Sequence, residues 1–587
     1  MSLSVHYIIA AVLTTVFAVF FSQSKKNRAM ALWIVPVLFY VLFYNYDFGL
    51  LDGPVPKMIP YAGGLYSCLF FLFLSSGVKT QERTGAKRNI PIIILLSFLQ
   101  CLCIFYALLL PWGIDVFPLS NIDAVLFTLF AGTNEGSGEF VISSVREKVL
   151  GPTVQIFLVM QFVQIVATAF LSKKKWGLNF HWWKLKYSLN TKGYKAKLQQ
   201  LQKGVLVCLG LYCLVQSIVL PGILLSAPFK ALFQIPVDSE LYREHFVAPD
   251  SAGIKPPEKL KNLIVVMLES METNFERYTP EIAELQQNNT NFAPGGVSVA
   301  GTSWTIAGIT GKLCGIPLNM PMGIDEYLGK LPTYLPYANC LMDLLEKYNY
   351  KQIYMQGSSG EFTQKRKFWT VHGNVVVHDI EFYRREGAIP EKYRVFWGFE
   401  DRKLYRFAQK ELDSLSAKDR PFALYMLTVD THQPEGYVDA QCAKEFSGVE
   451  AKLPTALRCA SKQLNDFISW AKKQPWFENT VISVMGDHTM PNLSPKANVP
   501  LSDSLYWINF IVNSSIKGPV RNRQYTSFDM FPTLLEAMGF ELEGRSAGLG
   551  RSLYSDSLTM LEIYGRQTLD SLLRERSVQY DKILFGK

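Results

Sequence analysis

Six apolar runs lie in the first 227 residues of this chain, and they constrain its fold more than any other feature. A helix needs about 20 apolar residues to cross a bilayer, and each run is near that length or longer. The first run lacks a basic start and a small-residue cleavage site, so we interpret it as a span and not as a removed signal peptide. The runs are Val5–Ser22, Ala29–Asp47, Met58–Val78, Ile90–Trp112, Thr153–Ser172 and Gly204–Ala227.

The positive charge of the chain follows these runs. The net charge is +9, which taken alone would be compatible with a nucleic-acid partner. The basic residues, however, gather in "QSKKNR", in "KTQERTGAKR" and in Lys173–Lys203, which carries nine Lys and no acidic residue. Loops rich in Lys and Arg stay in the cytoplasm. With the N-terminus outside, all three loops fall on the cytoplasmic side, so the chain after Ala227 is expected outside, with no nucleic-acid partner.

The segment Lys173–Lys203 allows two interpretations. "FHWWKLKYSLNTKGYKAKL" mixes Trp and Tyr with Lys, as an interfacial helix on anionic lipid does. A cytoplasmic flank with an aromatic belt explains the same residues equally well.

Four of the nine cysteines lie in the outer part of the chain. An even number of cysteines in an oxidising compartment suggests disulfides. Pairing of sequence neighbours would join Cys314 to Cys340 and Cys442 to Cys459. The other connectivities, and free buried thiols, stay open at this point.

Beyond a polar linker at residues 228–260, apolar runs rich in Val and Ile alternate with helical patterns such as "LPYANCLMDLLEKYN" and "DMFPTLLEAMG". Continuous runs of this kind are typical of buried strands in a mostly parallel sheet. We therefore predict an α/β domain over residues 261–560 with helices on both faces, followed by a helical tail at 561–587. The predicted strands are Asn262–Ser270, Lys351–Gly357, Phe422–Asp430, Thr480–His488 and Tyr506–Ser514.

Polar side chains stand at the ends of four of these strands. In open α/β sheets ligands bind at the carboxyl ends of the strands. Glu269, Asp487 and His488 offer two carboxylates and an imidazole, a set that suits Mn²⁺ or Zn²⁺. A hydroxyl at a helix N-terminus could add a fourth ligand and act as the nucleophile. The stretch "VSVAGTSWTIAGITG" offers three, which are Thr302, Ser303 and Thr305.

At this point the chain resembles the alkaline phosphatase/sulfatase superfamily. The resemblance rests on "ES" after the first strand, "GTSWTIAG…CGIPL", "QGSSGEF", "TVDTHQPEG", "GDH" and "GLGRSL", in that order over about residues 260–555. Within the superfamily, the chain is most similar to the membrane-anchored phosphoglycerol transferases that decorate osmoregulated periplasmic glucans. Lipoteichoic acid synthases and phosphoethanolamine transferases are related branches.

The resemblance implies one divalent metal, most often Mn²⁺, with Zn²⁺ or Mg²⁺ as alternatives. By position, its ligands would be Glu269, Thr302, Asp487 and His488, with Thr302 also the nucleophile. Ser303 and Thr305 fall outside the family's nucleophile position and are expected in the first turn of a helix.

The resemblance also implies substrate contacts. His432 in "TVDTHQPEG" matches a substrate-site His and is the candidate acid–base residue. Lys365 falls where lipoteichoic acid synthases carry a phosphate-binding Arg, although Lys lacks the bidentate geometry of Arg. Gln356, at a strand end, and His372 complete the predicted substrate contacts.

Two departures from related families narrow the chemistry. The C/S-x-P-x-R pattern of sulfatases does not occur, so sulfate ester hydrolysis is not expected. The stretch "TMPNLSPKANVP" after His488 has no further His, unlike the zinc-rich site of phosphoethanolamine transferases.

The sequence therefore predicts a multi-pass protein of the bacterial inner membrane with its catalytic domain in the periplasm. It would move phosphoglycerol from phosphatidylglycerol to a periplasmic glycan through a covalent Thr302 intermediate and release diacylglycerol. The alternative is transfer of phosphoethanolamine to lipid A or to a surface glycan. A catalytically silent lipid-binding protein is a third hypothesis, because a fold does not by itself guarantee activity.

Overall fold

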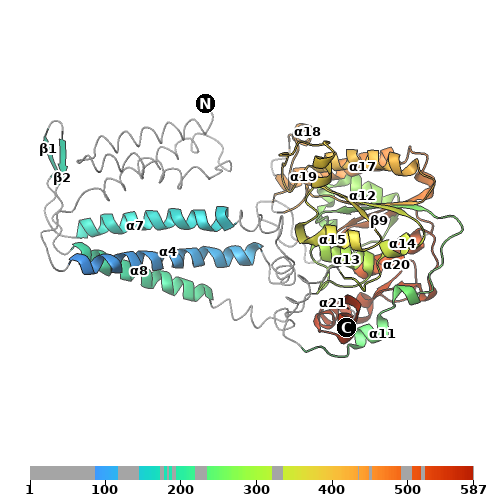
Figure 1. Ribbon diagram of the computed structural model, residues 1–587, viewed down its shortest axis with the longest axis horizontal. Coiled ribbons are helices and arrows are strands. Elements are labelled where there is room, and N and C mark those ends of the chain that lie inside the picture. The colour runs from blue at the N-terminus through green and yellow to red at the C-terminus, as the bar shows by residue number, and fades with distance from the viewer. Residues whose placement is uncertain are drawn as a thin grey trace. The chain divides into compact units, whose positions relative to one another are not determined.

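The computed structural model describes residues 86–116, 145–171, 178–181, 184–187, 194–217, 235–319, 335–433, 435–448, 452–490, 506–516 and 522–585. The described residues up to 217 form one compact unit, and those from 235 onward form another (Figure 1). The first three predicted spans, Val5–Ser22, Ala29–Asp47 and Met58–Val78, lie outside the described residues.

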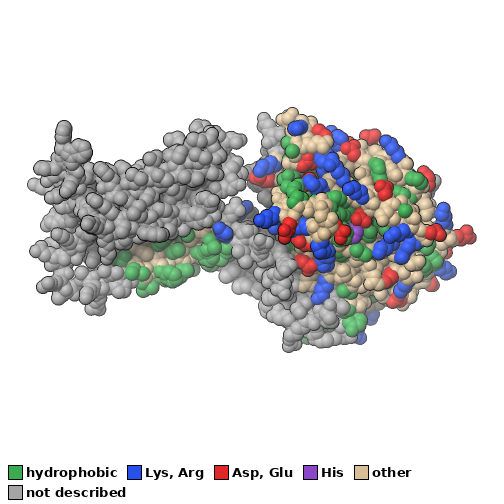
Figure 2. Space-filling model, turned by 45° about the horizontal axis from the view of Figure 1, so that its top comes forward, with side chains coloured by type: hydrophobic (Ala, Val, Ile, Leu, Met, Phe, Trp, Pro, Cys, Tyr) green, Lys and Arg blue, Asp and Glu red, His purple; other side chains and the backbone are tan. Residues whose placement is uncertain are grey.

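The first unit contains three helices long and apolar enough to cross a membrane, α4 (Ala86–Val116), α7 (Gly151–Leu171) and α8 (Tyr194–Ser217). The short π-helix η3 (Arg146–Leu150) leads into α7. The candidate spans are Ile92–Trp112, Lys148–Ile165 and Leu198–Ser217, with mean hydropathies of 2.6, 1.3 and 1.3. Exposed apolar side chains line these helices (Figure 2). The fourth and fifth predicted spans thus coincide with membrane-length helices.

The sixth predicted span, Gly204–Ala227, overlaps helix α8 over residues 204–217, and α8 itself begins at Tyr194. The rest of that span lies outside the described residues. Of the two interpretations left open for Lys173–Lys203, the interfacial helix does not fit residues 178–187, where β1 (Leu178–His181) and β2 (Lys184–Tyr187) form an antiparallel hairpin. The alternation of polar and apolar residues in these strands, with the aromatic side chains Phe180 and Tyr187, favours this conformation.

Glutamine side chains join the three membrane-length helices. Gln161 and Gln164 of α7 donate to the side-chain oxygen of Gln100 in α4, at 2.7 and 3.3 Å. The Gln100 amide donates to the carbonyl of Gln202 in α8 at 2.8 Å. In an apolar environment such bonds hold helices together, because the polar groups lack an alternative partner there.

The second unit is built on a seven-stranded sheet in the order β4-β9-β8-β3-β7-β5-β6. Strands β8, β3, β7, β5 and β6 run parallel, whereas β9 is antiparallel to both β8 and β4. The five predicted strands are therefore confirmed, and β4 and β6 are added to them. The bounds are β3 Asn262–Leu268, β4 Thr290–Asn291, β5 Lys351–Gln356, β6 Val376–His378, β7 Phe422–Leu427, β8 Thr480–Gly486 and β9 Asn509–Val512.

Helices cover both faces of this sheet, as predicted. Side chains alternate between the faces of a strand, so Val265 and Ile264 of β3 belong to two separate apolar cores. The core around Val265 packs against α13 (Thr305–Cys314), α14 (Leu341–Lys347), α15 (Lys365–Val371), α20 (Met530–Ala537), α21 (Met560–Arg574) and α22 (Val578–Phe585). The core around Ile264 packs against α12 (Pro280–Gln287), α16 (Ile380–Arg385), α17 (Asp401–Ser416) and α19 (Lys452–Ala471).

The two chain segments that flank the predicted domain also pack on it. In the predicted linker, helix α11 (Glu240–His245) buries Leu241 and Tyr242 in the first core. In the C-terminal tail, Leu569 and Tyr580 are buried in the same core. The helical tail thus packs on the domain.

Two disulfides tie the second unit, Cys314–Cys340 and Cys442–Cys459. The neighbour pairing that the sequence suggested is therefore the one present. The first bond joins the C-terminal end of α13 to the residue before α14, and the second joins α18 (Ala440–Glu445) to α19.

Candidate functional site

The carboxyl ends of the central strands bring the predicted metal ligands together. Strand β3 ends just before Glu269, and its parallel neighbour β8 ends just before Asp487 and His488, with Leu268 opposite Gly486. One ligand atom from each of these three residues lies within 4.8 Å of the others. His488 Nε2 is 3.4 Å from Asp487 Oδ2 and 3.7 Å from Glu269 Oε1. All three side chains are buried.

Backbone contacts orient these ligands toward one point. The amides of Ser270 and His488 both donate to Asp487 Oδ1, each at 2.8 Å. Asp487 Oδ2 is buried and has no hydrogen-bond partner among the described residues. His488 Nδ1 contacts the carbonyl of Thr489 at 2.8 Å, which places the proton on Nδ1 and the lone pair on Nε2. A buried unpartnered carboxylate oxygen beside an imidazole lone pair fits a divalent metal.

The electrostatics of the site also favour a cation. Burial, and then the charge of Glu269, raise the pKa of Asp487 to about 6. Burial lowers the pKa of His488, but Asp487 and Glu269 raise it more, so it lies above its ordinary value of 6.5. Two carboxylates buried side by side repel each other, and a bound cation would relieve that repulsion.

The structure places Thr302 and Thr305, two of the three candidate hydroxyls, in different surroundings. Thr302 is fully buried, and its Oγ1 both donates to the carbonyl and accepts from the amide of Val299, at 2.9 Å each. Its methyl group lies beside Gly311, in the second half of α13. Thr305 is instead the first residue of α13 and half-buried, and its Oγ1 is 3.4 Å from His488 Nε2. Thr305, and not Thr302, presents its hydroxyl to the metal ligands.

Helix α13 can approach the ligands this closely because of a glycine and a buried lysine. A Cβ on Gly308 would lie 2.1 Å from the carbonyl oxygen of Asp487, so only glycine fits one turn into the helix. One turn further, Lys312 Nζ donates to the same carbonyl at 2.7 Å and to Ser527 Oγ at 3.2 Å. The same Nζ lies 4.0 Å from the ring centre of Trp507. Burial lowers the pKa of Lys312 to about 7. Lys312 was not among the predicted site residues, although it is the one charged residue of this helical segment and could have indicated a functional position.

His432 lies on the loop that follows β7. Thr428 Oγ1 accepts from the amide of Glu269 at 3.0 Å, and Thr431 Oγ1 donates to the carbonyl of Glu269 at 2.6 Å. These two hydrogen bonds hold the loop against the end of β3. His432 Nδ1 contacts the carbonyl of Gln433 at 2.8 Å. The Nε2 atom is thereby left to exchange a proton. Burial raises the pKa of Glu269, but His432 and then His488 lower it to a value below the usual range.

A pair of buried carboxyl groups holds the same loop from behind. The Asp401 carboxylate accepts from the amides of Val429 and Asp430, at 2.8 and 2.9 Å. The Asp401 amide donates to Asp430 Oδ2 at 3.0 Å. These bonds fix the start of α17 to the chain just before His432.

The predicted substrate contacts differ in their surroundings. Lys365 is buried at the start of α15, where Nζ donates to the carbonyl of Phe362 at 2.9 Å. Burial lowers the pKa of Lys365 to about 8, whereas the charges of Glu269 and Asp487 raise it. Lys365 therefore interacts electrostatically with both of these candidate ligands. Gln356 is buried at the end of β5, and local contacts occupy its amide, with Tyr354 donating to it and Ser358 accepting from it.

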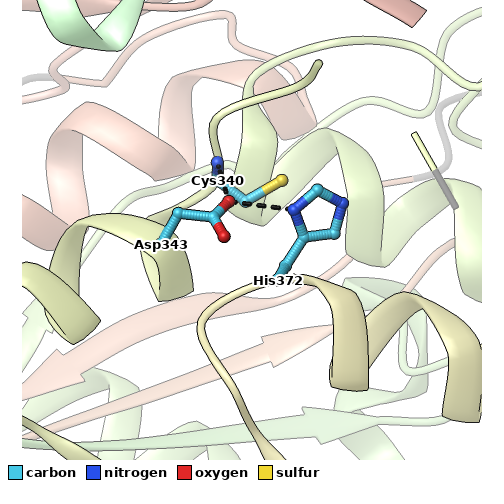
Figure 3. Close-up of side chains that lie close together, drawn as sticks. All are labelled: Cys340, Asp343 and His372. Atoms are coloured by element: carbon cyan, nitrogen blue, oxygen red, sulfur yellow. Dashed lines mark hydrogen bonds and ion pairs between the residues drawn. The ribbon is translucent and has the colours of Figure 1, made fainter. Parts of the chain in front are cut away.

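His372 belongs to a different cluster. Figure 3 shows it facing Asp343 and Cys340, with His372 Nδ1 2.9 Å from Asp343 Oδ2. The same Asp343 oxygen accepts from the amide of Cys340 at 2.8 Å and thereby caps α14. Because the Cys340 sulfur is bonded to Cys314, no thiolate is available for a metal. No contact between His372 and the Glu269 cluster occurs among the described residues, so its predicted role as a substrate ligand gains no support.

Comparison with known proteins places this geometry in context. The sulfatase family profile matches residues 261–540. A protein named phosphoglycerol transferase I from Xanthomonas campestris pv. campestris is 30% identical over 314 residues, which are 51% of this chain and 44% of that protein. The match thus spans less than half the length of that relative.

Solved structures also resemble the chain. The lipoteichoic acid synthase LtaP from Listeria monocytogenes is 20% identical and gives a TM-score of 0.39, with 51% of this chain and 79% of that chain covered. The lipooligosaccharide phosphoethanolamine transferase A from Neisseria meningitidis is 14% identical and gives a TM-score of 0.39, with 92% and 97% covered.

Proposed function

We propose that the chain, whose residues 261–540 match the sulfatase family profile, is a metal-dependent phosphoglycerol transferase anchored in the bacterial inner membrane. It takes phosphoglycerol from phosphatidylglycerol and passes it to a glycan in the periplasm. The observation that carries the proposal is the Thr305 hydroxyl at the start of α13, 3.4 Å from His488 Nε2, which itself lies beside two buried carboxylates. The name of the Xanthomonas relative supports phosphoglycerol as the transferred group.

The membrane-length helices fit this choice of donor. A lipid donor keeps its head group at the bilayer surface, so a transferase tethered to the bilayer meets it at high effective concentration. Three such helices are present among the described residues.

Glu269, Asp487 and His488 would hold the metal, with Thr305 as a further ligand in place of Thr302. Mn²⁺ is our first choice, and Zn²⁺ and Mg²⁺ are the alternatives. A divalent metal bound there supplies Lewis-acid activation of the hydroxyl and neutralises charge on the phosphoryl oxygens. The amides at the start of α13 favour the same anionic group.

The chain's own residues carry the two transfers. Thr305 Oγ1, having lost its proton, forms a bond to phosphorus, and the bond from phosphorus to the diacylglycerol oxygen breaks. A proton on His432 Nε2 goes to that leaving oxygen. His432 Nε2 then takes the proton of the glycan hydroxyl, the new oxygen–phosphorus bond forms, and Thr305 leaves as it began. His432 thus ends each cycle protonated, as it started.

A pair of variants tests the nucleophile. Thr305→Ala removes the hydroxyl that reaches His488 and should lower diacylglycerol release from phosphatidylglycerol by about 10³-fold or more, about 4 kcal/mol of barrier. Thr302→Ser keeps the buried hydroxyl on Val299 and should retain most of the activity. Release that survives Thr305→Ala undiminished would refute the assignment. A parallel assay with phosphatidylethanolamine separates phosphoglycerol from phosphoethanolamine transfer.

A further inference from the structure

Four aromatic side chains form a continuous row beside the candidate site. The ring centre of Phe362 lies 5.5 Å from that of Trp397, Trp397 lies 6.3 Å from Phe396, and Phe396 stacks on Tyr437 at 6.0 Å. All four side chains are half-buried, so part of each is open to solvent. We call Phe362, Phe396, Trp397 and Tyr437 the aromatic row. Neither the mechanism nor the predicted substrate contacts use them.

The row runs directly past the proposed acid–base residue. The Trp397 ring centre is 4.7 Å from that of His432, and Phe396 is 6.5 Å from it. At the other end, Lys365 Nζ lies 4.8 Å from the ring centre of Phe362. A molecule lying on the row would therefore have its polar groups beside His432 and Lys365.

The backbone holds the row in place. Ser358 and Gly398 form an antiparallel bridge, and the Phe399 amide donates to the carbonyl of Gly357 at 3.0 Å. A Cβ on Gly398 would lie 1.8 Å from the carbonyl oxygen of Gly357, so this close approach requires glycine. On the opposite side, the Tyr437 amide donates to the carbonyl of Asp430 at 2.7 Å. The rings are thus fixed before a ligand arrives, which lowers the entropy cost of binding.

We propose that the aromatic row is the acceptor subsite and holds a hexose ring of the glycan. The C–H face of a pyranose is apolar and slightly positive, and it packs on the negative face of an aromatic ring. The sugar hydroxyls at the ring's edge then point to His432, where the proposed transfer needs an acceptor oxygen. The role of the row as an acceptor subsite rests on the proposed function. The binding of a sugar by the row does not.

The surroundings of the row favour a sugar over a bilayer. A membrane-inserting surface presents strongly exposed apolar side chains. Near the row in the chain stand exposed charged residues of both signs, Glu361, Glu391, Lys392 and Arg394, together with half-buried uncharged residues. Mixed charge around half-buried rings is the composition of a sugar-binding surface and not of a lipid-inserting one.

The test measures two quantities: binding of a sugar to the chain, and the division of the transferred phosphoglycerol between that sugar and water. The acceptor probe is laminarihexaose, and the full chain is held in lipid nanodiscs that contain phosphatidylglycerol. The variants are Trp397→Ala, the conservative Trp397→Phe and, as control, Tyr337→Ala, an exposed aromatic outside the row. Saturation-transfer NMR reports contact with the sugar C–H protons. The ratio of phosphoglycerol on the sugar to free glycerol phosphate reports how the acceptor competes with water.

Trp397→Ala should abolish the saturation transfer and lower the transfer ratio about tenfold. Trp397→Phe should restore at least half of the ratio, and Tyr337→Ala should match the unmodified chain. If the chain shows sugar contacts that depend on Trp397 but releases no diacylglycerol, the row stands and the proposed function fails. An unchanged ratio and unchanged saturation transfer in Trp397→Ala would overturn the row. Tryptophan fluorescence that is quenched by nanodisc lipids brominated on their acyl chains, with the quenching lost in Trp397→Ala but the sugar contacts kept, would make the row a membrane contact and also overturn the proposal.

Discussion

His488 shows at the scale of one residue how the site chooses between a proton and a metal. Its Nδ1 is committed to the Thr489 carbonyl, so Nε2 alone faces Glu269 and Asp487. The same two carboxylates that attract a metal also raise the pKa of the imidazole. In the metal-free chain that raised pKa stabilises the fold below pH 6.5, and the stabilisation is lost as the pH rises through the folded value.

We therefore expect metal binding to weaken as the pH falls. A metal must displace the proton on Nε2, so below the raised pKa of His488 the affinity for Mn²⁺ should drop by about tenfold per pH unit. Titration calorimetry of the metal-stripped chain at several pH values, in buffers of different ionisation enthalpy, measures both affinity and proton release. His245→Gln, at a histidine of α11, should keep the same profile. An affinity for Mn²⁺ independent of pH between 5 and 8 would show that His488 is not a ligand.

The cluster of Glu269, Asp487 and His488 was predictable from the sequence because these residues stand at strand ends. The surroundings of the two threonine hydroxyls were not predictable. Whether Thr302 or Thr305 faces the ligands depends on where α13 begins, and the extended backbone of Trp304 places that start at Thr305. The family resemblance pointed to Thr302, whose hydroxyl is fully occupied by Val299.

The start of α17 and the loop after β7 depend on each other at the scale of elements. Asp401 and Asp430 join them, and both carboxyl groups are buried. Burial, and then the charge of Asp401, raise the pKa of Asp430 well above its ordinary range, and burial raises that of Asp401 to about 7. The folded chain thus holds these protons more tightly than the unfolded chain. That contribution is complete below pH 3.8 and is lost as the pH rises through about 7.

Asp430→Asn should consequently stabilise the chain at alkaline pH. The amide oxygen can still accept from the Asp401 amide, and the like charge beside Asp401 is removed. We expect a gain on the order of 1–2 kcal/mol in the free energy of unfolding at pH 8 and a much smaller change at pH 5. Chemical denaturation at the two pH values measures it. An equal change in the free energy of unfolding at both pH values, or a loss of stability at pH 8, would show that repulsion between Asp401 and Asp430 does not destabilise the chain.

The long apolar runs and helical patterns of the sequence made five strands, the helices on both sheet faces and the helical tail predictable. Strands β4 and β6 were not, since they have only two and three residues. The hairpin of β1 and β2 was missed because aromatic and basic residues suit an interfacial helix as well as a strand. The aromatic row was also not predictable from the sequence, since its members come from three segments that are far apart in the chain.

At the scale of the whole molecule, the chain divides into a unit of membrane-length helices and an α/β unit closed by two disulfides. The Cys314–Cys340 bond ties the far end of α13, the helix whose first residue is Thr305. The disulfide therefore restrains the element that carries the proposed nucleophile.

Replacing both Cys314 and Cys340 by Ser should destabilise the α/β unit. The bond closes a separation of 26 residues, and loop-closure entropy assigns about 3 kcal/mol to a loop of this size. Denaturant unfolding of the full chain, followed by a signal from the α/β unit, measures the loss. The matched control replaces Cys442 and Cys459, which are 17 residues apart and should give a similar loss without affecting α13. An unaltered midpoint in the first variant would contradict the restraint.

The most direct measurement of the central claim is mass spectrometry of the peptide that contains Thr302 and Thr305. The full chain is incubated with phosphatidylglycerol and Mn²⁺ without a glycan, quenched in acid and digested, and the peptide is fragmented. We predict one glycerophosphoryl group on Thr305, absent from the Thr305→Ala variant. A glycerophosphoryl group on Thr302, or diacylglycerol release with no modified threonine in the quenched chain, would contradict it.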